Sequence, residues 1–145
     1  MAPTGEGTST RIYLAPLRGV TKRAYRALFW KRFGGVDVAV SPFILAWGEN
    51  LTDRRLLGEI DPERDQAMPV IPQVIGGVPE HIATICRTLG AMGYDVVNLN
   101  LGCPYRMVTK KRRGAGLLAL PDVVREMLQR VHEEARVRLS IKTRL

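Results

Sequence analysis

One cysteine stands where a thiol could do acid–base chemistry. The apolar and β-branched stretch 96–101 stops at Gly102, Cys103 and Pro104. Such a stretch predicts a buried strand that delivers Cys103 onto a loop at its carboxyl end, where parallel α/β folds place their reactive groups. Because a thiol is mostly protonated near neutral pH, it could donate a proton there. The alternative is that Cys103 is a small buried hydrophobic residue.

A basic run follows the cysteine and could bind phosphate. It consists of Lys110, Lys111, Arg112 and Arg113. Over all 145 residues, 22 Lys and Arg face 14 Asp and Glu, which gives a net charge of +8. This balance favours polyanions such as nucleic acid. A solvated basic loop is the alternative interpretation of the run.

The cysteine pattern and the hydropathy exclude several other kinds of site. Cys86 and Cys103 belong to no CxxC motif and to no Cys/His cluster with zinc-like spacing, so we expect no metal site and a reducing, cytoplasmic location. Helical spacing predicts that Cys86 is a core residue. No run of about 18 apolar residues is present, so we expect no membrane span. Residues 1–10, rich in Gly, Ser, Thr and Pro, predict a flexible tail.

The elements that would position these residues alternate between strand and helix. Strands are predicted over 11–15, 37–41, 69–75, 95–100 and 139–144. Helices are predicted over 21–33, 44–58, 79–92 and onward from 121, the first with Ala24, Tyr25, Leu28 and Phe29 on one face. The alternation predicts one domain with a parallel sheet and right-handed crossovers. The prolines within 69–75 are unusual for the middle of a sheet.

Four segments in this order resemble the motifs of the tRNA-dihydrouridine synthases. They are residues 12–21, Pro72 with Gln73, residues 100–104 followed by 114–118, and residues 142–144. The sequence departs from the family at Asn98, where Asp is usual, and at Lys22, where an acidic residue is common.

The resemblance implies a flavin enzyme built on a TIM (β/α)8 barrel with a C-terminal helical domain. A complete barrel needs about 250 residues. The resemblance therefore implies that residues 11–145 form a partial FMN-binding barrel domain with strands 1 to 5. The second half of the barrel and the RNA-binding helical domain are expected to be absent from it.

The resemblance also implies a reaction and its residues. The family reduces the 5,6 double bond of uridines in tRNA, with hydride from reduced FMN to carbon 6 and a proton from Cys103 to carbon 5. NADPH or NADH would reduce the FMN. The implied flavin contacts are Ala15, Pro16, Leu17, Gln73 and Lys142. The implied substrate contacts are Asn100 and Arg144 with the uracil, and Lys110, Lys111, Arg112 and Arg113 with RNA.

Purely structural roles for these residues, and two other functions for the chain, are alternatives to this hypothesis. Taken alone, Pro16 would terminate a strand, Gln73 would be a polar strand end and Lys142 would be an exposed lysine. One rival function is another FMN-dependent oxidoreductase acting on a free pyrimidine. The other is an inactive fragment or a non-catalytic RNA-binding remnant. A half barrel alone is expected to bind FMN poorly, to have little activity, and to expose strand edges and apolar surface.

Overall fold

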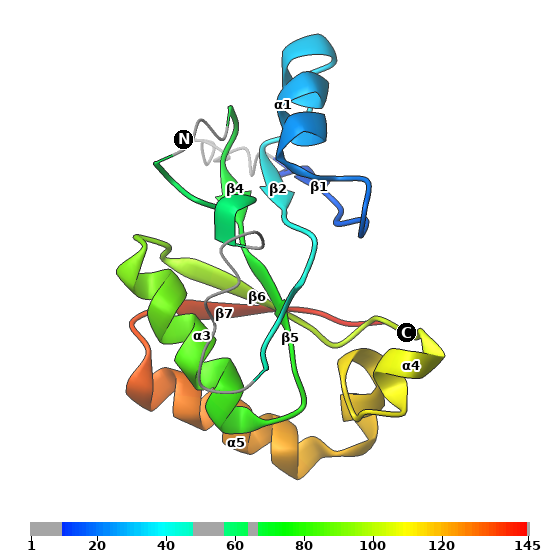
Figure 1. Ribbon diagram of the computed structural model, residues 1–145, viewed down its shortest axis with the longest axis vertical. Coiled ribbons are helices and arrows are strands. Elements are labelled where there is room, and N and C mark those ends of the chain that lie inside the picture. The colour runs from blue at the N-terminus through cyan, green and yellow to red at the C-terminus, as the bar shows by residue number, and fades with distance from the viewer. Residues whose placement is uncertain (1–9, 48–56, 64–66, 145) are drawn as a thin grey trace, which may run out of the picture.

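The structure is a computed structural model that describes residues 10–47, 57–63 and 67–144. The strands are β1 (Tyr13–Leu14), β2 (Val38–Val40), β3 (Ile44–Leu45), β4 (Val70–Ile71), β5 (Gln73–Ile75), β6 (Val96–Asn100) and β7 (Arg138–Lys142). The helices are α1 (Arg23–Arg32), α3 (Pro79–Ala91), α4 (Arg106–Thr109), the 3-10 helix η1 (Gly114–Ala119) and α5 (Pro121–Glu134). The chain is an α/β fold, as predicted (Figure 1).

All strand pairs in the described residues are parallel, and the strands follow one another in chain order. One sheet has the order β1-β2-β4 and the other has the order β3-β5-β6-β7. Since β2 and β3 are successive parts of one segment, and so are β4 and β5, the segments run side by side from β1 to β7. Parallel strands in chain order, without a reversal, are the arrangement found in barrels.

Pro72 divides a segment that was predicted to be a single strand. The predicted strand 69–75 is interrupted at Pro72, which has no N–H to donate to a neighbour. At the interruption the Gln73 N–H donates to the Ser41 hydroxyl at 3.0 Å, and the Ser41 N–H donates to the Ile71 carbonyl. The Asn98 N–H still donates to the Pro72 carbonyl at 2.8 Å. A side-chain hydroxyl thus replaces one backbone partner, and the sheet continues past the break.

The predicted helix over 44–58 is wrong at its beginning. Ile44 and Leu45 form β3 and pair with Val74 and Ile75 of β5. Ile44 is buried in the core, so tertiary pairing overrides the helical composition of this stretch. Residues 57–58 are helical, as predicted, whereas 48–56 lie outside the described residues. The tail predicted over 1–10 lies outside them as well, except for Thr10.

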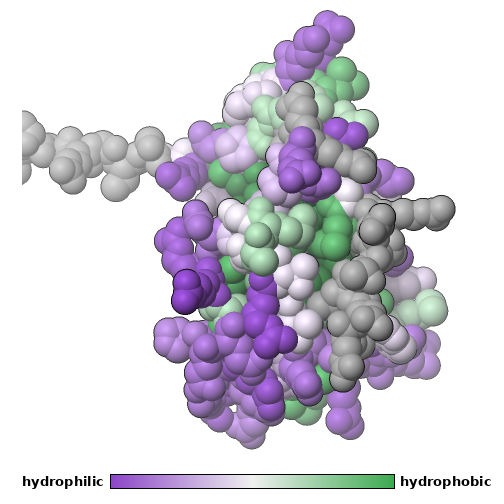
Figure 2. All heavy atoms as spheres, turned by 60° about the vertical axis from the view of Figure 1, so that its left-hand side comes forward, coloured by the Kyte–Doolittle hydropathy of each residue, from purple (hydrophilic) through white to green (hydrophobic). Residues whose placement is uncertain are grey.

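Helices α3 and α5 pack together on one face of the sheet and bury the main core (Figure 1). Each begins at a proline, whose fixed φ suits the first helical position. The buried apolar positions recur at helical spacing, as predicted for both helices. They include Ile82, Ile85, Leu89, Met127 and Val131. The opposite face of α5 is polar, and hydrophilic side chains gather in the lower part of Figure 2.

Helix α1 is built differently, because its buried side chain is Arg26. The Arg26 guanidinium donates to the carbonyls of Thr21 at 2.9 Å and of Glu59 at 2.6 Å. Burial lowers the pKa of Arg26, and the nearby Glu59 carboxylate partly offsets that effect. The apolar face predicted for this helix is largely exposed, with Leu28 58% accessible.

Candidate functional site

The loop that carries Cys103 begins directly after β6 and is fixed by backbone hydrogen bonds. The Asn100 side-chain oxygen accepts from the N–H groups of Gly102 at 3.1 Å and Cys103 at 3.0 Å. The Cys103 carbonyl accepts from the Ala115 N–H at 3.0 Å. Cys103 itself is half-buried. Its position therefore depends on Asn100 on one side and on the start of η1 on the other.

Gly114 allows η1 to approach this loop. Its φ of +55° is in the left-handed region that favours glycine. A methyl group added at Gly114 would lie 2.8 Å from the Cys103 carbonyl oxygen. Any larger residue would therefore push the Cys103 loop away from η1.

A chain of amide side chains crosses the sheet behind Cys103. The Asn100 amide nitrogen donates to the Gln73 side-chain oxygen at 3.0 Å. The Gln73 amide nitrogen donates to the Asn98 side-chain oxygen at 2.8 Å. The Asn98 amide nitrogen donates to the Ser140 hydroxyl at 2.9 Å, which donates to the Val97 carbonyl at 3.4 Å. The chain links β5, β6 and β7, and three of its members, Gln73, Asn98 and Asn100, are buried.

The backbone contacts of Asn100, at one end of this row of amides, determine the direction of every hydrogen bond in the row. The Asn100 oxygen must face the two backbone N–H groups, so its amide nitrogen must face Gln73. The Gln73 nitrogen must then face Asn98, and the Asn98 nitrogen must face Ser140. One backbone anchor thus fixes the orientation of three amides. Because each amide supports the next, the chain holds the Cys103 loop in one place.

The structure brings two further predicted residues to the same loop. The Arg144 Nε donates to the Gly102 carbonyl at 2.9 Å. Lys142 is exposed, lies opposite Asn100 in the register of β6 and β7, and accepts at its carbonyl from the Leu101 N–H at 2.8 Å. Asn100, Cys103, Lys142 and Arg144 therefore lie at or just after the carboxyl ends of β6 and β7, and Gln73, the first residue of β5, joins this cluster through its bond to Asn100.

A concavity of about 690 Å³ lies along the strands on this side of the sheet. We call it the inner hollow. Its lining includes Ala15, Pro16, Val40, Asn98, Ser140 and Lys142. Ala15 and Pro16, which follow β1, therefore line the same hollow as Lys142, which ends β7. Leu17 is 59% exposed and is not part of this lining.

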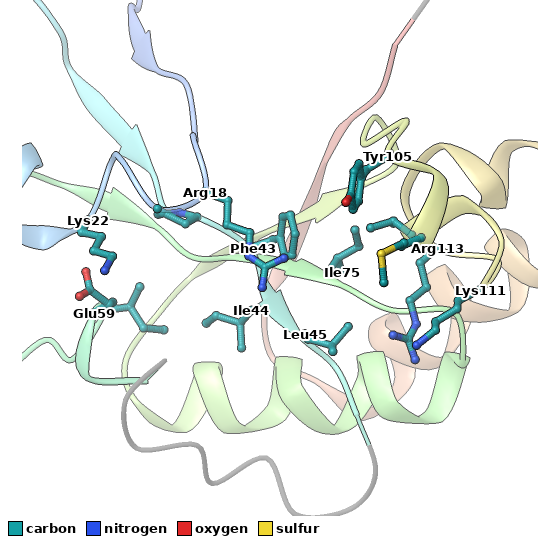
Figure 3. A pocket seen from close by; sticks show the side chains of 15 residues that line it. Arg18, Lys22, Phe43, Ile44, Leu45, Glu59, Ile75, Tyr105, Lys111 and Arg113 are labelled. Carbon is teal, nitrogen blue, oxygen red and sulfur yellow. The ribbon is translucent and has the colours of Figure 1, made fainter.

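A second concavity, of about 650 Å³, lies beside the Cys103 loop. We call it the cationic hollow. Its lining includes Arg18, Phe43, Ile75, Tyr105, Lys111 and Arg113 (Figure 3). Within the basic run, Lys111 and Arg113 line it, whereas Lys110 and Arg112 are exposed and line neither hollow. The Arg113 guanidinium lies 5.1 Å from the centre of the Trp47 ring.

Sequence reasoning did not predict the roles of Asn98, Ser140, Arg18 and Tyr105. Asn98 and Asn100 are two residues apart in an otherwise apolar strand, so their side chains share one face. This spacing was a signal that could have identified the pair. Ser140 had no comparable signal, because it meets Asn98 only through the register of β6 and β7.

The two cysteines occupy different environments. Cys86 is buried in the core, as predicted, and burial raises the pKa of its thiol to about 12. A thiol so protected is unreactive near neutral pH. In the part of the chain that the structure describes, no three His, Cys, Asp or Glu side chains are grouped as metal ligands. Nor does any described helix have the length and hydrophobicity needed to cross a membrane.

Comparison with known proteins identifies a family for this arrangement. The family described as Dihydrouridine synthase (Dus) matches residues 13–145. Similar curated proteins include tRNA-dihydrouridine synthase B of Yersinia pestis, 31% identical over 134 residues, and that of Shigella flexneri, 29% identical over 136 residues. The protein of the same name from Escherichia coli (strain K12) is also 29% identical over 136 residues. These alignments cover 92% of this chain but only 40% or 41% of each relative.

Proposed function

This chain belongs to the dihydrouridine synthase family, and we propose that it carries the proton-donating part of a tRNA-dihydrouridine synthase active site. The observation that carries the proposal is the position of Cys103. Asn100, η1 and Arg144 all bond the loop that holds it, at the carboxyl end of a buried parallel strand. A general acid must be held within reach of the atom that it protonates, and this loop is held from several sides.

In the proposed reaction, the C5=C6 double bond of a uracil is reduced. Bound and reduced FMN would supply the hydride that carbon 6 receives. The Cys103 thiol gives its proton to carbon 5, and the resulting thiolate regains a proton from solvent, so that charge and atoms balance. Reaching the thiol requires the uracil to leave its stack in the RNA. Asn100 and Arg144 border the loop, and we assign them to orienting the base and the thiol relative to each other.

The inner hollow fits the ring of a flavin in part. Its volume of about 690 Å³ is within the range typical of ligand sites, and Ala15, Pro16 and Lys142 line it. An exposed Lys142 could stabilise negative charge on a reduced ring. Gln73 fits less directly, because it is fully buried and its amide already bonds Asn98 and Asn100. We therefore assign Gln73 first to holding Asn100 and only second to the flavin edge.

We assign the five strand segments to the first five strands of a (β/α)8 barrel. The parallel pairing in chain order supports this assignment. The chain spans about two fifths of the length of the curated relatives that it matches, so we assign the rest of the flavin site to the part that it does not cover. On this view the 145-residue chain binds FMN poorly and is inactive alone, and NADPH or NADH reduces the flavin of the complete enzyme.

We assign tRNA as the substrate and the cytoplasm as the location. The net charge of +8 and the exposed Lys110 and Arg112 support binding to a polyanion. Two free cysteines are consistent with a reducing compartment.

A chimera tests the proposed function. This chain is joined to the part of the Escherichia coli (strain K12) relative that it does not cover, and the product is expressed in cells that lack tRNA-dihydrouridine synthases. The chimera is expected to bind flavin and to restore dihydrouridine in tRNA, measured by mass spectrometry. Cys103→Ala should lower the rate by about a hundredfold or more, the contribution of a general acid. Cys86→Ala, in the core, is the matched control and should retain the activity.

Two kinds of outcome would contradict the proposal. The first is a flavin-loaded chimera that makes no dihydrouridine, or one that keeps its rate without the Cys103 thiol. The second is dihydrouridine formation, with copurifying flavin, by the 145-residue chain alone, which would refute the assigned incompleteness. If the chimera does not assemble, a smaller exchange that transfers only residues 100–118 into the relative makes the same prediction for Cys103→Ala.

A further inference from the structure

The cationic hollow has an apolar and aromatic floor on which a base could stack. Phe43 comes from the segment before β3, Ile75 ends β5, and Tyr105 stands two residues after Cys103. Tyr105 is 61% exposed, so one face of its ring is accessible. Bases of single-stranded RNA stack on such rings, and the volume of about 650 Å³ is within the range of small-ligand sites.

Cations lie at both ends of this floor. Lys22 lies at one end beside Glu59, Lys111 and Arg113 lie at the other, and Arg18 lies between the two ends (Figure 3). Arg18 is already held over the floor, with its guanidinium 5.5 Å from the centre of the Phe43 ring. A site for a ligand with phosphate on one side would need cations at one end only. In an RNA strand each base is flanked by a phosphate on either side, which matches cations at both ends.

Among the described residues of the lining, Glu59 is the one carboxylate, and it does not cancel this charge. Glu59 accepts a hydrogen bond at 2.6 Å from the backbone N–H of Arg23, the first residue of α1. The positive end of the helix dipole at that position offsets part of its charge. The described part of the lining therefore presents four basic side chains against one carboxylate, which is hydrogen-bonded to the first residue of a helix.

We propose that the cationic hollow binds one nucleotide of the same RNA strand that presents the target uridine. This inference rests on the proposed function. The base lies between the Phe43 and Tyr105 rings beside the Arg18 guanidinium, and its flanking phosphates meet Lys22 at one end and Lys111 and Arg113 at the other. Because Tyr105 and Cys103 are on one loop, a nucleotide bound here would hold the strand beside the thiol.

A binding experiment with a fluorescein-labelled single-stranded oligouridylate tests the proposal. Fluorescence anisotropy measures its affinity for the 145-residue chain at a series of salt concentrations. Tyr105→Leu is expected to weaken binding about tenfold, the effect of losing one base–aromatic stack. Tyr105→Phe keeps the ring and should bind as the original chain does. Lys111→Met should weaken binding and lower the slope of log affinity against log salt by about one. Lys31→Met, at the far end of α1, removes the same charge and should change neither.

Equal effects of Lys111→Met and Lys31→Met would overturn the proposal, because binding would then follow net charge alone. Unchanged binding in Tyr105→Leu would overturn it as well. A third contradicting result is that NADPH displaces the oligouridylate and is itself bound more weakly by Tyr105→Leu, since the hollow would then serve a dinucleotide. The readout needs neither flavin nor reduction. A chain that binds RNA in this way but supports no dihydrouridine formation in the chimera would therefore refute only the proposed function.

Discussion

Helices α3 and α1 are both crossovers between strands, but different forces hold them. Helix α3 buries five residues in the core, among them Ile82, Ile85 and Leu89. Helix α1 buries Arg26, which donates to two backbone carbonyls, while its apolar residues Tyr25 and Leu28 are exposed. Apolar packing is non-directional and cumulative, whereas a buried guanidinium holds only while its acceptors stay in place. By the α3 region we mean α3 and the core cluster that it helps to form. The Cys103 loop lies between Leu101 and Leu117 of that cluster, so it should keep its structure when α1 loosens.

The largest expected effect is in the α3 region. Ile85→Ala should lower the free energy of unfolding by about 2–5 kcal/mol, because it removes buried methyl groups and leaves a cavity. Urea unfolding followed by circular dichroism measures the change. Leu28→Ala, on the exposed face of α1, is the matched control and should cost far less. Equal costs for the two substitutions would contradict the proposed difference between the helices.

In the α1 region, Arg26→Met should cost about 1.5–3 kcal/mol, the range for hydrogen bonds to charged groups. The Thr21 and Glu59 carbonyls would lose their buried donor. Amide hydrogen exchange measured by mass spectrometry should become faster in α1 and stay unchanged in α3. If exchange becomes faster in both helices together, the two regions unfold as one unit and the comparison fails.

The buried thiol of Cys86 makes the α3 region sensitive to alkaline pH. Its folded pKa of about 12 lies above the ordinary thiol value. Its contribution is therefore fully present below the unfolded pKa and is lost as pH rises toward 12, because the unfolded thiol ionises first. The loss should be about 1.4 kcal/mol per pH unit.

Comparison of the pH dependence of unfolding in the original chain and in Cys86→Ala measures this contribution. The variant has a lower stability at neutral pH because of its cavity, but it should show a shallower decline above the ordinary thiol pKa. Parallel curves for the two proteins would show that the Cys86 thiol ionises equally in both states.

A smaller effect is expected at the end of the amide chain. Ser140→Ala removes the acceptor of the Asn98 amide nitrogen and should cost about 1 kcal/mol. Ser140→Thr keeps the hydroxyl and should retain most of the stability. Thermal unfolding of the three proteins distinguishes these cases. If Ser140→Ala costs nothing, the Asn98 amide has another partner, and the chain of hydrogen bonds does not depend on its anchor in β7.

The smallest effect on stability is expected at Phe33, which is 78% exposed just after α1. Phe33→Ser should change the free energy of unfolding by less than about 0.5 kcal/mol. It should nevertheless reduce self-association, because Tyr25 and Phe33 are exposed and their rings flank the half-buried ring of Phe29. Sedimentation velocity over a range of concentrations measures the association. Identical association of the two proteins would mean that these rings have no part in it.

The parts of the fold that were predicted correctly depend on local patterns. The helices from Pro79 and Pro121, the strand before Asn100 and the burial of Cys86 all follow from spacing within about fifteen residues. The break at Pro72 and the strand at Ile44 do not, because their partners come from other segments. Similarly, Arg26 is buried only because Glu59, 33 residues away, returns to it.

The candidate site shows the same division. The position of Cys103 at a strand end was predictable, since glycine and proline mark where the strand stops. The support behind it was not predictable, because Gln73 meets Asn98 and Asn100 across 25 and 27 residues. Hydrogen bonds between strands depend on register, which a single strand does not specify.

The Cys103 loop and the segment after it are held mainly through their backbones. A methyl group at Gly114 would meet the Cys103 carbonyl, and one at Gly77 would lie 2.6 Å from the Arg112 carbonyl. At Gly114 and at Gly77, therefore, one backbone segment packs directly against another. The side chains of residues 105–113 can be exchanged in evolution without moving the thiol. Under the proposed function, a family built on this loop could change the RNA that it prefers while conserving the geometry of its chemistry.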